Sequence, residues 1–513
     1  MNAADTQFLE TLAKLNNSNP FSRERLELER QALGDAYRPD DDELWSRTPH
    51  TRLKERPNVA LLTERADEMA VRMREKLQAG ETFDRQLQEQ YDALATYVLY
   101  YRHVAVRKID EIAGTATQAK RHRVWREFWS EYQLFFSGTA RVGHDRQAAA
   151  HLFACLFQVR RAFKHIFDCI LGESLPVARL REQVWQSIFT HDLQRYRRSL
   201  YHSLRELPTL ITGPSGTGKE LVARSIAMSQ YLSFDPEQER FVEDHSCAFT
   251  PLNLSALSPT LIESELFGHR RGAFTGADAD RVGWLEACRP HGAVFLDEIG
   301  ELDMTIQVKL LRVLQQRTYC RIGESNERTF AGKIIAATNR DLAAEMHSGQ
   351  FRHDLFYRLC ADLIETPSLA AQLADRPAAL EGLVLLLAER IAPGEANTLA
   401  SEALQWIAKN LPADYAWPGN IRELEQCVRN ILVRGEYRPH TPQQVSRVEW
   451  LANAESGKLS AEQMLRSYAT WLYAKHGTYE AVAKQMEIDR RTVKSKIDQA
   501  MLAKLQGSPS KRA

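Results

Sequence analysis

A short glycine-rich run in the middle of the chain limits what this sequence can fold into more than any other feature. The run is Gly213-Pro214-Ser215-Gly216-Thr217-Gly218-Lys219. It follows the apolar segment Leu207 to Thr212, which predicts a strand, and precedes Glu220 to Ser229, which has helical spacing. A strand, a glycine-rich loop and a helix in this order indicate a P-loop, whose backbone N–H groups and helix N-terminus surround phosphate oxygens. Lys219 is expected to neutralise the β- and γ-phosphates.

A pair of carboxylates follows a second apolar run about 80 residues later. Ala293 to Leu296 predicts a buried strand that leads directly into Asp297 and Glu298. Asp297 can hold a Mg²⁺ ion, directly or through water, and Glu298 can polarise an attacking water as general base. The alternative is a solvated acidic pair at a strand end. Together with the P-loop, the pair predicts ATP hydrolysis with Mg²⁺.

The pattern of helix-breaking residues and apolar runs changes at about residue 170. Long stretches without glycine or proline precede this point, and they predict a helical bundle: Asn58 to Ala79, Glu81 to Ala113, Thr115 to Ser137 and His144 to Leu171. Short apolar runs that alternate with helical stretches follow, including Thr209 to Thr212 and Lys333 to Ala337. This alternation indicates a parallel α/β sheet. Helical sequence resumes after Ala370.

The end of the chain predicts a helix-turn-helix. Ser460 and Gln463 fit a capping box, Gly477 ends the first helix, and Thr478 and Asp489 can cap two more. The third helix is basic and is expected to lie in the DNA major groove. Its candidate DNA-binding residues are Arg490, Arg491, Thr492, Lys494 and Lys496. A helical cap that does not bind DNA is the alternative.

Charge is balanced over the whole chain but not along it. Lys plus Arg and Asp plus Glu both number 67, whereas residues 457–513 hold 11 basic and 5 acidic side chains. This basic end suits nucleic acid. No stretch predicts a transmembrane helix or a signal peptide, so we expect a cytoplasmic protein without membrane partners. The seven cysteines lack C-x-x-C spacing and are expected to be free thiols.

Residues 171–433 resemble the AAA+ domain of sigma-54-dependent transcription activators, the bacterial enhancer-binding proteins. The most specific segments are Glu265-Leu266-Phe267-Gly268-His269 and Gly272-Ala273-Phe274-Thr275-Gly276-Ala277. In the family, the second segment is the loop that contacts sigma-54. The resemblance therefore implies the sigma-54 RNA polymerase holoenzyme as a partner, with Phe274 and Thr275 as exposed contact groups.

Further motifs of the family follow in order, and their roles are implied by the resemblance. Asn253 would sense nucleotide through Glu298, and Asn339 would be sensor I. Arg352 and Arg358 would be fingers on the neighbouring subunit's nucleotide, which implies a hexameric or heptameric ring. Arg422 would face the phosphates in cis as sensor II, and Arg321 would be a further contact between subunits.

Two places near the expected nucleotide site differ from the usual pattern of the family or of P-loops in general. The segment after Pro367 lacks the family's usual arginines, which puts contacts near the lid or the adenine pocket in doubt. Glu220 stands where a Ser or Thr usually binds Mg²⁺ in P-loops, but this family often carries Glu there.

The expected architecture is a multidomain protein with an α-helical N-terminal domain, an AAA+ α/β P-loop ATPase with a helical lid, and a C-terminal helix-turn-helix. The boundaries are 1–170 for the regulatory domain, 171–368 for the AAA+ core, 369–433 for the lid, 434–456 for a linker, 457–506 for the helix-turn-helix and 507–513 for a flexible tail. The helix-turn-helix resembles the Fis type, in which glycine usually stands at the position of Glu487, so a less tight turn is expected.

The N-terminal third resembles no family that we can name. Its dense aromatic residues, at 97–101 and 125–136, could line a ligand pocket or form a packed core. The acidic run at residues 40–42 is read as a solvated cap or turn. The leading hypothesis is an ATP-driven activator that binds upstream DNA and remodels the sigma-54 closed complex, with an unknown ligand or protein acting at residues 1–170. The alternatives are a regulator that uses nucleotide only as an assembly switch and a remodeller of another protein.

Overall fold

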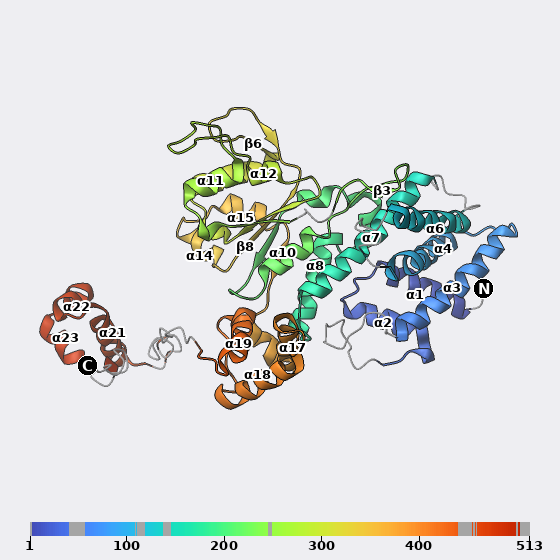
Figure 1. Cartoon of the computed structure of the whole chain (residues 1–513). Helices are drawn as coiled ribbons and strands as arrows, with labels where there is room; N and C mark the ends of the chain where they lie inside the picture. Colours follow the sequence, from blue (N-terminus) through green and yellow to red (C-terminus); the bar gives the residue numbers. More distant parts are fainter. Residues whose placement is uncertain are drawn as a thin grey trace. The chain divides into compact units, whose positions relative to one another are not determined.

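A computed structural model describes residues 3–39, 57–107, 109, 118–136, 145–244, 249–439, 454, 457, 459–498 and 501–502. The chain divides into two compact units, Met1–Tyr437 and Arg438–Ala513 (Figure 1). The acidic run at 40–42, Cys247, most of the proposed linker and the proposed tail lie outside the described residues. Within the described part, no helix is long and apolar enough to cross a membrane.

The described N-terminal third is helical, as the breaker-free stretches predicted. Asp84 and Asp145 cap two of its helices, since each carboxylate accepts a backbone N–H of the first turn. A core of aromatic and aliphatic side chains, with Tyr91, Trp125 and Phe153 among the largest, joins the helices. The elements are α1 (Ala3–Asn17), α2 (Arg23–Leu33), η1 (Gly34–Ala36), α3 (Pro57–Gln78), α4 (Arg85–Leu99), the π-helix η2 (Tyr100–Ala105), α6 (Gln118–Phe136) and α7 (Arg146–Cys169).

A five-stranded parallel sheet forms the centre of the next segment, in the order β4-β5-β8-β1-β9. The strands are β1 (Thr209–Thr212), β4 (Phe249–Asn253), β5 (Ala293–Asp297), β8 (Lys333–Thr338) and β9 (Leu363–Glu365). The sequence predicted β1, β5 and β8, and the parallel α/β fold is confirmed. Their side chains are buried on both faces, which explains their continuous apolar runs.

Helices and two small hairpins surround this sheet. The helices of this segment are α8 (Leu175–Phe189), α9 (Leu193–Arg195), the π-helix η3 (Tyr196–Leu200), η4 (Ser203–Glu206), α10 (Lys219–Ala227), η6 (Leu254–Ala256), α11 (Pro259–Phe267), α12 (Trp284–Ala287), η7 (Ile299–Glu301), α13 (Met304–Gln316), α14 (Leu342–His347) and α15 (His353–Leu359). The hairpins pair β2 (Phe234–Asp235) with β3 (Arg240–Phe241) and β6 (Thr318–Tyr319) with β7 (Arg328–Thr329).

Helix α7 and the β2–β3 hairpin join the N-terminal helices to the sheet segment. Figure 1 shows α7 running beside α8 and α10, and buried residues of α7, α8, α10 and the sheet share one apolar cluster. On the other side, Phe234 of the hairpin packs among the N-terminal aromatic residues, with its ring centroid 4.8 Å from that of Trp125 and 5.0 Å from that of Phe153. The two segments therefore bury each other's apolar side chains.

Four helices after the sheet form a smaller cluster with its own apolar core. They are α16 (Leu369–Asp375), α17 (Ala379–Ile391), α18 (Ala396–Asn410) and α19 (Asn420–Arg434). Gly435 ends α19 in the left-handed conformation, at φ 71°.

The second unit contains three described helices, α21 (Ala461–His476), α22 (Tyr479–Met486) and α23 (Arg490–Lys496). The predicted capping box of Ser460 and Gln463 is present, and Thr478 and Asp489 cap the next two helices. Glu487 adopts the left-handed conformation, with φ 56°, that glycine usually supplies at such a turn. The turn is therefore closed as a glycine would close it, and the expectation of a looser turn was wrong.

Candidate functional site

The glycine-rich loop joins β1 to α10 and needs glycine for steric reasons at two positions. Gly213 and Gly216 have φ values of 140° and 79°. A Cβ at Gly213 would lie 2.2 Å from Oγ1 of Thr366, and one at Gly216 would lie 2.2 Å from the carbonyl oxygen of Gly419. The loop is thus packed against β9 on one side and the start of α19 on the other.

Lys219 begins α10 and points back over the loop. Its Nζ donates to the carbonyl oxygens of Gly213 at 2.9 Å and Pro214 at 3.2 Å. Burial lowers the pKa of Lys219, while the nearby Glu298 and Asp297 carboxylates act against that shift. The ammonium group therefore lies where it can exchange loop carbonyls for the oxygens of a bound anion.

The two predicted carboxylates lie at the end of β5, facing the loop. Burial raises the pKa of Asp297, and the positive charge of Lys219 opposes this rise. Glu298 has left-handed backbone, with φ 58°, and its Oε2 accepts a hydrogen bond from the Asn339 N–H at 3.2 Å. A non-glycine residue held in this conformation costs about 1–3 kcal/mol, and such strain is found at functional sites. The strained backbone fixes the direction of the Glu298 carboxylate.

A cavity of about 460 Å³ lies between the loop, the carboxylates and the α16–α19 helices. This volume is within the usual range for small-molecule sites. The predicted residues that line it are Ser215, Gly216, Thr217, Gly218, Lys219, Glu220, Asn253, Asp297, Glu298 and Arg422. Its remaining wall includes apolar side chains that the sequence did not identify: Ile170, Leu171, Val177, Leu180, Leu387 and Ile421. The cavity wall therefore has both polar and apolar parts.

The start of α19 is docked onto the glycine-rich loop. Nη1 of Arg422 lies 3.4 Å from Oγ of Ser215, and Nδ2 of Asn420 donates to the Ser215 carbonyl at 2.9 Å. Asn420 also accepts the Leu369 N–H at 2.8 Å. Arg390 of α17 lines the same cavity, which places an arginine there although residues 367–373 contain none.

Asn253 does not contact Glu298, contrary to the expected sensor contact. Its Oδ1 accepts the Ser255 N–H at 3.0 Å and the Ser255 hydroxyl at 2.7 Å. This local turn satisfies the amide oxygen, so Asn253 lines the cavity without reaching Glu298. Among the described hydrogen bonds, the one to the Glu298 carboxylate comes from Asn339.

The two predicted finger arginines lie outside the cavity of their own chain. Arg352 stands at the N-cap position of α15 and forms an ion pair with Asp354, at 2.7 Å, and Arg358 is exposed on the same helix. Next to it, Tyr357 is 73% exposed, which is high for an aromatic residue in a folded protein. Neither arginine therefore lines the 460 Å³ cavity of its own chain.

The segment Gly272 to Ala277 forms a tight loop on the surface of the sheet segment. Gly272 N–H donates to the Ala277 carbonyl at 2.8 Å, and Gly272 and Gly276 have φ values of 80° and 99°. Thr275 is exposed, as predicted, but Phe274 is half-buried and packs edge-on against His269, with ring centroids 5.0 Å apart. The prediction of an exposed Phe274 was wrong because His269 covers the ring.

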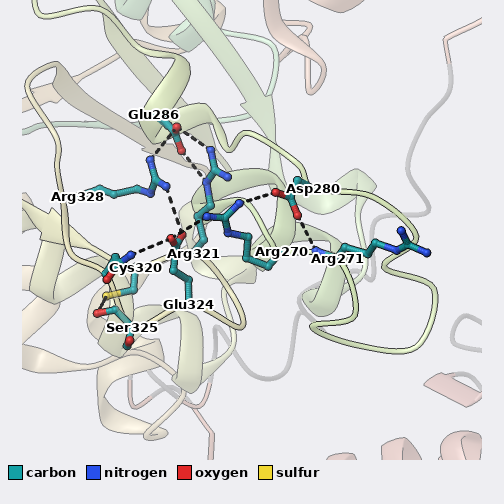
Figure 2. A network of polar contacts seen from close by, with 10 residues as sticks. Arg270, Arg271, Asp280, Glu286, Cys320, Arg321, Glu324, Ser325 and Arg328 are labelled. Atoms are coloured by element: carbon teal, nitrogen blue, oxygen red, sulfur yellow. Dashed lines mark hydrogen bonds and ion pairs between the residues drawn. The ribbon is translucent and has the colours of Figure 1, made fainter.

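A polar network holds both ends of this loop (Figure 2). Arg270 before the loop pairs with Asp280 after it, at 2.5 Å, and with Glu324 of the β6–β7 connection, at 3.2 Å. Arg321 donates to both carboxylate oxygens of Glu286, at 2.7 and 2.9 Å. The Arg321 side chain is 9% exposed, so its guanidinium is engaged within the chain, whereas the sequence predicted a contact between subunits. Residue spacing gave no signal of this network.

The candidate DNA-binding residues lie on α23, at the outside of the second unit. Arg490, Arg491, Thr492 and Lys494 are exposed, while Lys496 is half-buried and donates to Glu462 of α21 at 3.1 Å. Arg490 pairs with Glu480 of α22 at 2.9 Å. Three exposed basic side chains thus share one short helix, and Lys496 contributes to packing.

The sheet segment is similar to known proteins. Residues 189–365 match the family model described as the Sigma-54 interaction domain. The transcriptional regulatory protein ZraR of Escherichia coli K12 is 44% identical over 235 residues, which are 45% of this chain and 49% of ZraR. The Nif-specific regulatory protein of Azotobacter vinelandii is 40% identical over 227 residues, 44% of this chain and 40% of the relative. The chain thus spans about half the length of the curated relatives it matches, or less.

A search of solved structures finds NtrX from Brucella abortus, at 24% identity and a TM-score of 0.39. The match covers 74% of this chain and 80% of that chain.

Proposed function

Because residues 189–365 belong to the Sigma-54 interaction domain family, we propose that the protein is a sigma-54-dependent transcription activator. In this proposal, a cytoplasmic ring binds DNA upstream of a promoter. It uses ATP hydrolysis to convert the closed complex of sigma-54 RNA polymerase into an open one. The observation that carries the proposal is the cavity in which Lys219, Asp297 and Glu298 meet.

The lining of the cavity suits ATP. The loop N–H groups, Lys219 and Arg422 supply positive potential for a triphosphate. Ile170, Val177 and Leu387 supply apolar surface for an adenine ring. Arg390 and Gln372 line the wall near the α16–α19 helices, where the family's usual arginines are missing.

The residues present also fit a Mg²⁺ ion. The described residues contain no cluster of three or more His, Cys, Asp or Glu side chains that could hold a metal by themselves. Mg²⁺ beside a nucleotide needs only one or two carboxylates, because phosphates and waters supply the other ligands. Asp297 would hold the ion, with Glu220 near it, and the bound ion would neutralise charge on the phosphates.

Glu298 is the proposed general base. The Asn339 N–H donates to one carboxylate oxygen, so the other oxygen is available for a water. Lys219 and Arg422 would stabilise charge on the phosphates in cis. Arg352 and Arg358, which lie outside the cavity, would complete the site of a neighbouring subunit in a hexameric or heptameric ring.

Residues 272–277 would contact sigma-54, and α23 would contact DNA. Thr275 is the exposed hydroxyl of the loop, and the network around Arg321 and Glu286 holds the loop's base. In the second unit, the exposed Arg491 and Lys494 would contact DNA phosphates or bases.

The N-terminal helices are proposed to regulate the ATPase through α7. Gln158 of α7 donates to the Ser229 carbonyl at 2.9 Å, and Arg161 donates to the Met228 carbonyl, both at the end of α10. The Ser225 hydroxyl of α10 donates back to the His165 carbonyl at 3.2 Å. Because α10 begins with Lys219, a shift of α7 would reach the phosphate site.

The test is open-complex formation on a sigma-54 promoter with ATP, measured by permanganate footprinting. We expect Glu298→Ala to lose both hydrolysis and open complexes, and Thr275→Ala to lose open complexes while it retains hydrolysis. Thr250→Ala, a substitution in β4 away from the loop, is the control. Full activity of Thr275→Ala would remove sigma-54 contact from the proposal, and full activity of Glu298→Ala would leave the nucleotide as an assembly switch only.

A further inference from the structure

A second cavity, of about 150 Å³, lies between the N-terminal helices and the segment before β1. We call it the junction cavity. Its walls come from α1, α2, α3, α4, η2 and α7 on one side and from α8, α9 and η3 on the other. Its lining includes Arg25, Tyr100, Tyr101, Arg160, Trp185 and Arg197.

Aromatic rings form much of the wall. Tyr101 packs against Tyr97 and Tyr100, with ring centroids 4.6 and 5.1 Å apart. Phe163 of α7 and Trp185 of α8 also line the cavity, and both contact Phe21. A cavity of about 150 Å³ is large enough for one benzene ring. The shape and the lining therefore suit a planar single-ring compound.

Three guanidinium groups reach the same cavity, and the charges of two of them are not balanced. Arg25 is paired with Glu29 at 2.8 Å. For the Arg160 and Arg197 side chains, the described part of the chain offers neither a hydrogen-bond acceptor nor a carboxylate partner, and the Nε of Arg160 is buried without a partner. Burial lowers the pKa of Arg197 below its ordinary value. Partly buried cations without a counter-charge are unfavourable, and a bound anion would relieve this cost.

The backbone beside the junction cavity contains two irregular helical turns. The two π-helices in the described residues are Tyr100–Ala105 and Tyr196–Leu200. Both border the junction cavity, since the first carries Tyr100, Tyr101 and Ala105 and the second carries Arg197. A π-helix is costly and is often retained at a functional site. Here each π-helix places one or more of its side chains in the cavity wall.

We propose that the junction cavity binds a small single-ring aromatic carboxylate, with the ring between Tyr101 and Trp185 and the carboxylate on Arg160 and Arg197. Benzoate is the probe of this class. The bound compound would contact both the N-terminal helices and η3, which precedes β1 and the glycine-rich loop. Coupling of this binding to ATP hydrolysis rests on the proposed function, whereas the binding itself does not.

The test is isothermal titration of the full-length protein with benzoate. We expect one site per chain, and binding at least about 10-fold weaker in Arg197→Met and in Arg160→Met, because a charge-assisted hydrogen bond is lost. Arg198→Met removes an exposed neighbouring charge that does not line the cavity and should bind as the wild type does. Ala105→Leu should block binding by filling the cavity.

Two further ligands separate the ring from the charge. Benzyl alcohol, which lacks the carboxylate, and acetate, which lacks the ring, should each bind at least about 10-fold more weakly than benzoate. The proposal is overturned if benzoate gives no saturable heat, if acetate equals benzoate, or if neither arginine variant differs from Arg198→Met.

Folding of the variants is checked by far-UV circular dichroism, whose spectrum should match that of the wild type. Without ligand, Arg197→Met should melt at the same temperature as the wild type or higher, since it removes an unpaired, partly buried charge. If Arg197→Met fails to fold, Arg160→Met and Ala105→Leu decide the result.

Discussion

The backbone N–H of Asn339 lies 3.2 Å from Oε2 of Glu298 and joins the ends of the two neighbouring strands β8 and β5. This contact comes from the main chain, so the position of the Glu298 carboxylate depends on the register of the sheet and only weakly on the Asn339 side chain. A change of sheet register would move the Glu298 carboxylate, the proposed base, away from its place at the end of β5.

Replacement of Glu298 by glutamine should separate binding from hydrolysis. Glu298→Gln keeps the shape and the Asn339 contact but cannot accept a proton, so hydrolysis should fall by about 100-fold or more while ATP still binds. Phosphate release and nucleotide titration measure the two properties. Glu402→Gln, on the exposed side of α18, is the matched control. Hydrolysis at the wild-type rate in Glu298→Gln would assign the base to another residue.

Gly216→Ala should disrupt the docking of the lid onto the loop. Its Cβ would lie 2.2 Å from the Gly419 carbonyl oxygen, in addition to the strain of a positive φ. Gly349→Ala is a matched control, because Gly349 has φ 74° and no atom within 4 Å of the added Cβ. Both variants carry the backbone cost of about 1 kcal/mol. ADP affinity should fall at least about 10-fold in Gly216→Ala only, and equal losses would exclude the lid contact as the cause.

The Glu286 carboxylate predicts a loss of stability in acid. Hydrogen bonds from Arg321 hold the pKa of Glu286 below its ordinary value of 4.5. A lowered folded pKa adds stability above the unfolded pKa, and this contribution is lost as pH falls through the folded value. The melting temperature of the wild type should therefore drop more between pH 7 and acid below 4.5 than that of Glu286→Gln. Glu327→Gln, at an exposed ion pair, should behave as the wild type. Parallel curves for wild type and Glu286→Gln would show that this carboxylate does not titrate with folding.

Glu487→Gly should stabilise the second unit. Glu487 has φ 56° at the end of α22, and a residue with a Cβ is disfavoured there by about 1 kcal/mol. Gly477→Ala makes the opposite change at φ 72° and should destabilise. Hydrogen exchange of the α21–α23 amides in the full-length protein measures both. Slower exchange is expected in Glu487→Gly and faster exchange in Gly477→Ala, and the reverse order would contradict the strain argument.

The sequence predicted those elements whose signals lie within a few consecutive residues. The strands β1, β5 and β8 are buried on both faces and read as continuous apolar runs, and the caps Ser460, Thr478 and Asp489 follow from residue type and spacing. The edge strand β4 was missed because it contains Pro251, which an edge tolerates, and β9 was missed because it has only three residues.

In the candidate site, too, the sequence predicted motifs of consecutive residues and not the contacts between distant ones. The glycine-rich loop and the Asp297–Glu298 pair are each a run of consecutive residues, so the sequence alone could identify both motifs and predict one nucleotide site from them. Contacts between residues far apart could not, such as the one between Arg321 and Glu286 or the contribution of Arg390 to the cavity. The family resemblance assigned Arg321 and Phe274 to contacts with other molecules, whereas in this chain Glu286 and His269 engage them. The roles of the remaining site residues and the domain boundaries stay predictions.

The hairpin that places Phe234 among the N-terminal aromatic residues changes how this protein can be dissected. A truncation at residue 170 would strip Phe234 and Phe241 of their covering and leave them in water, which favours aggregation. It would also cut away Cys169 and Ile170, which line the 460 Å³ cavity. Loss of activity after such a deletion would report damage to the sheet segment and would say nothing about regulation by the N-terminal helices. Point substitutions within α7, such as Gln158→Leu, are therefore better suited to weaken the contact between the N-terminal helices and the sheet segment.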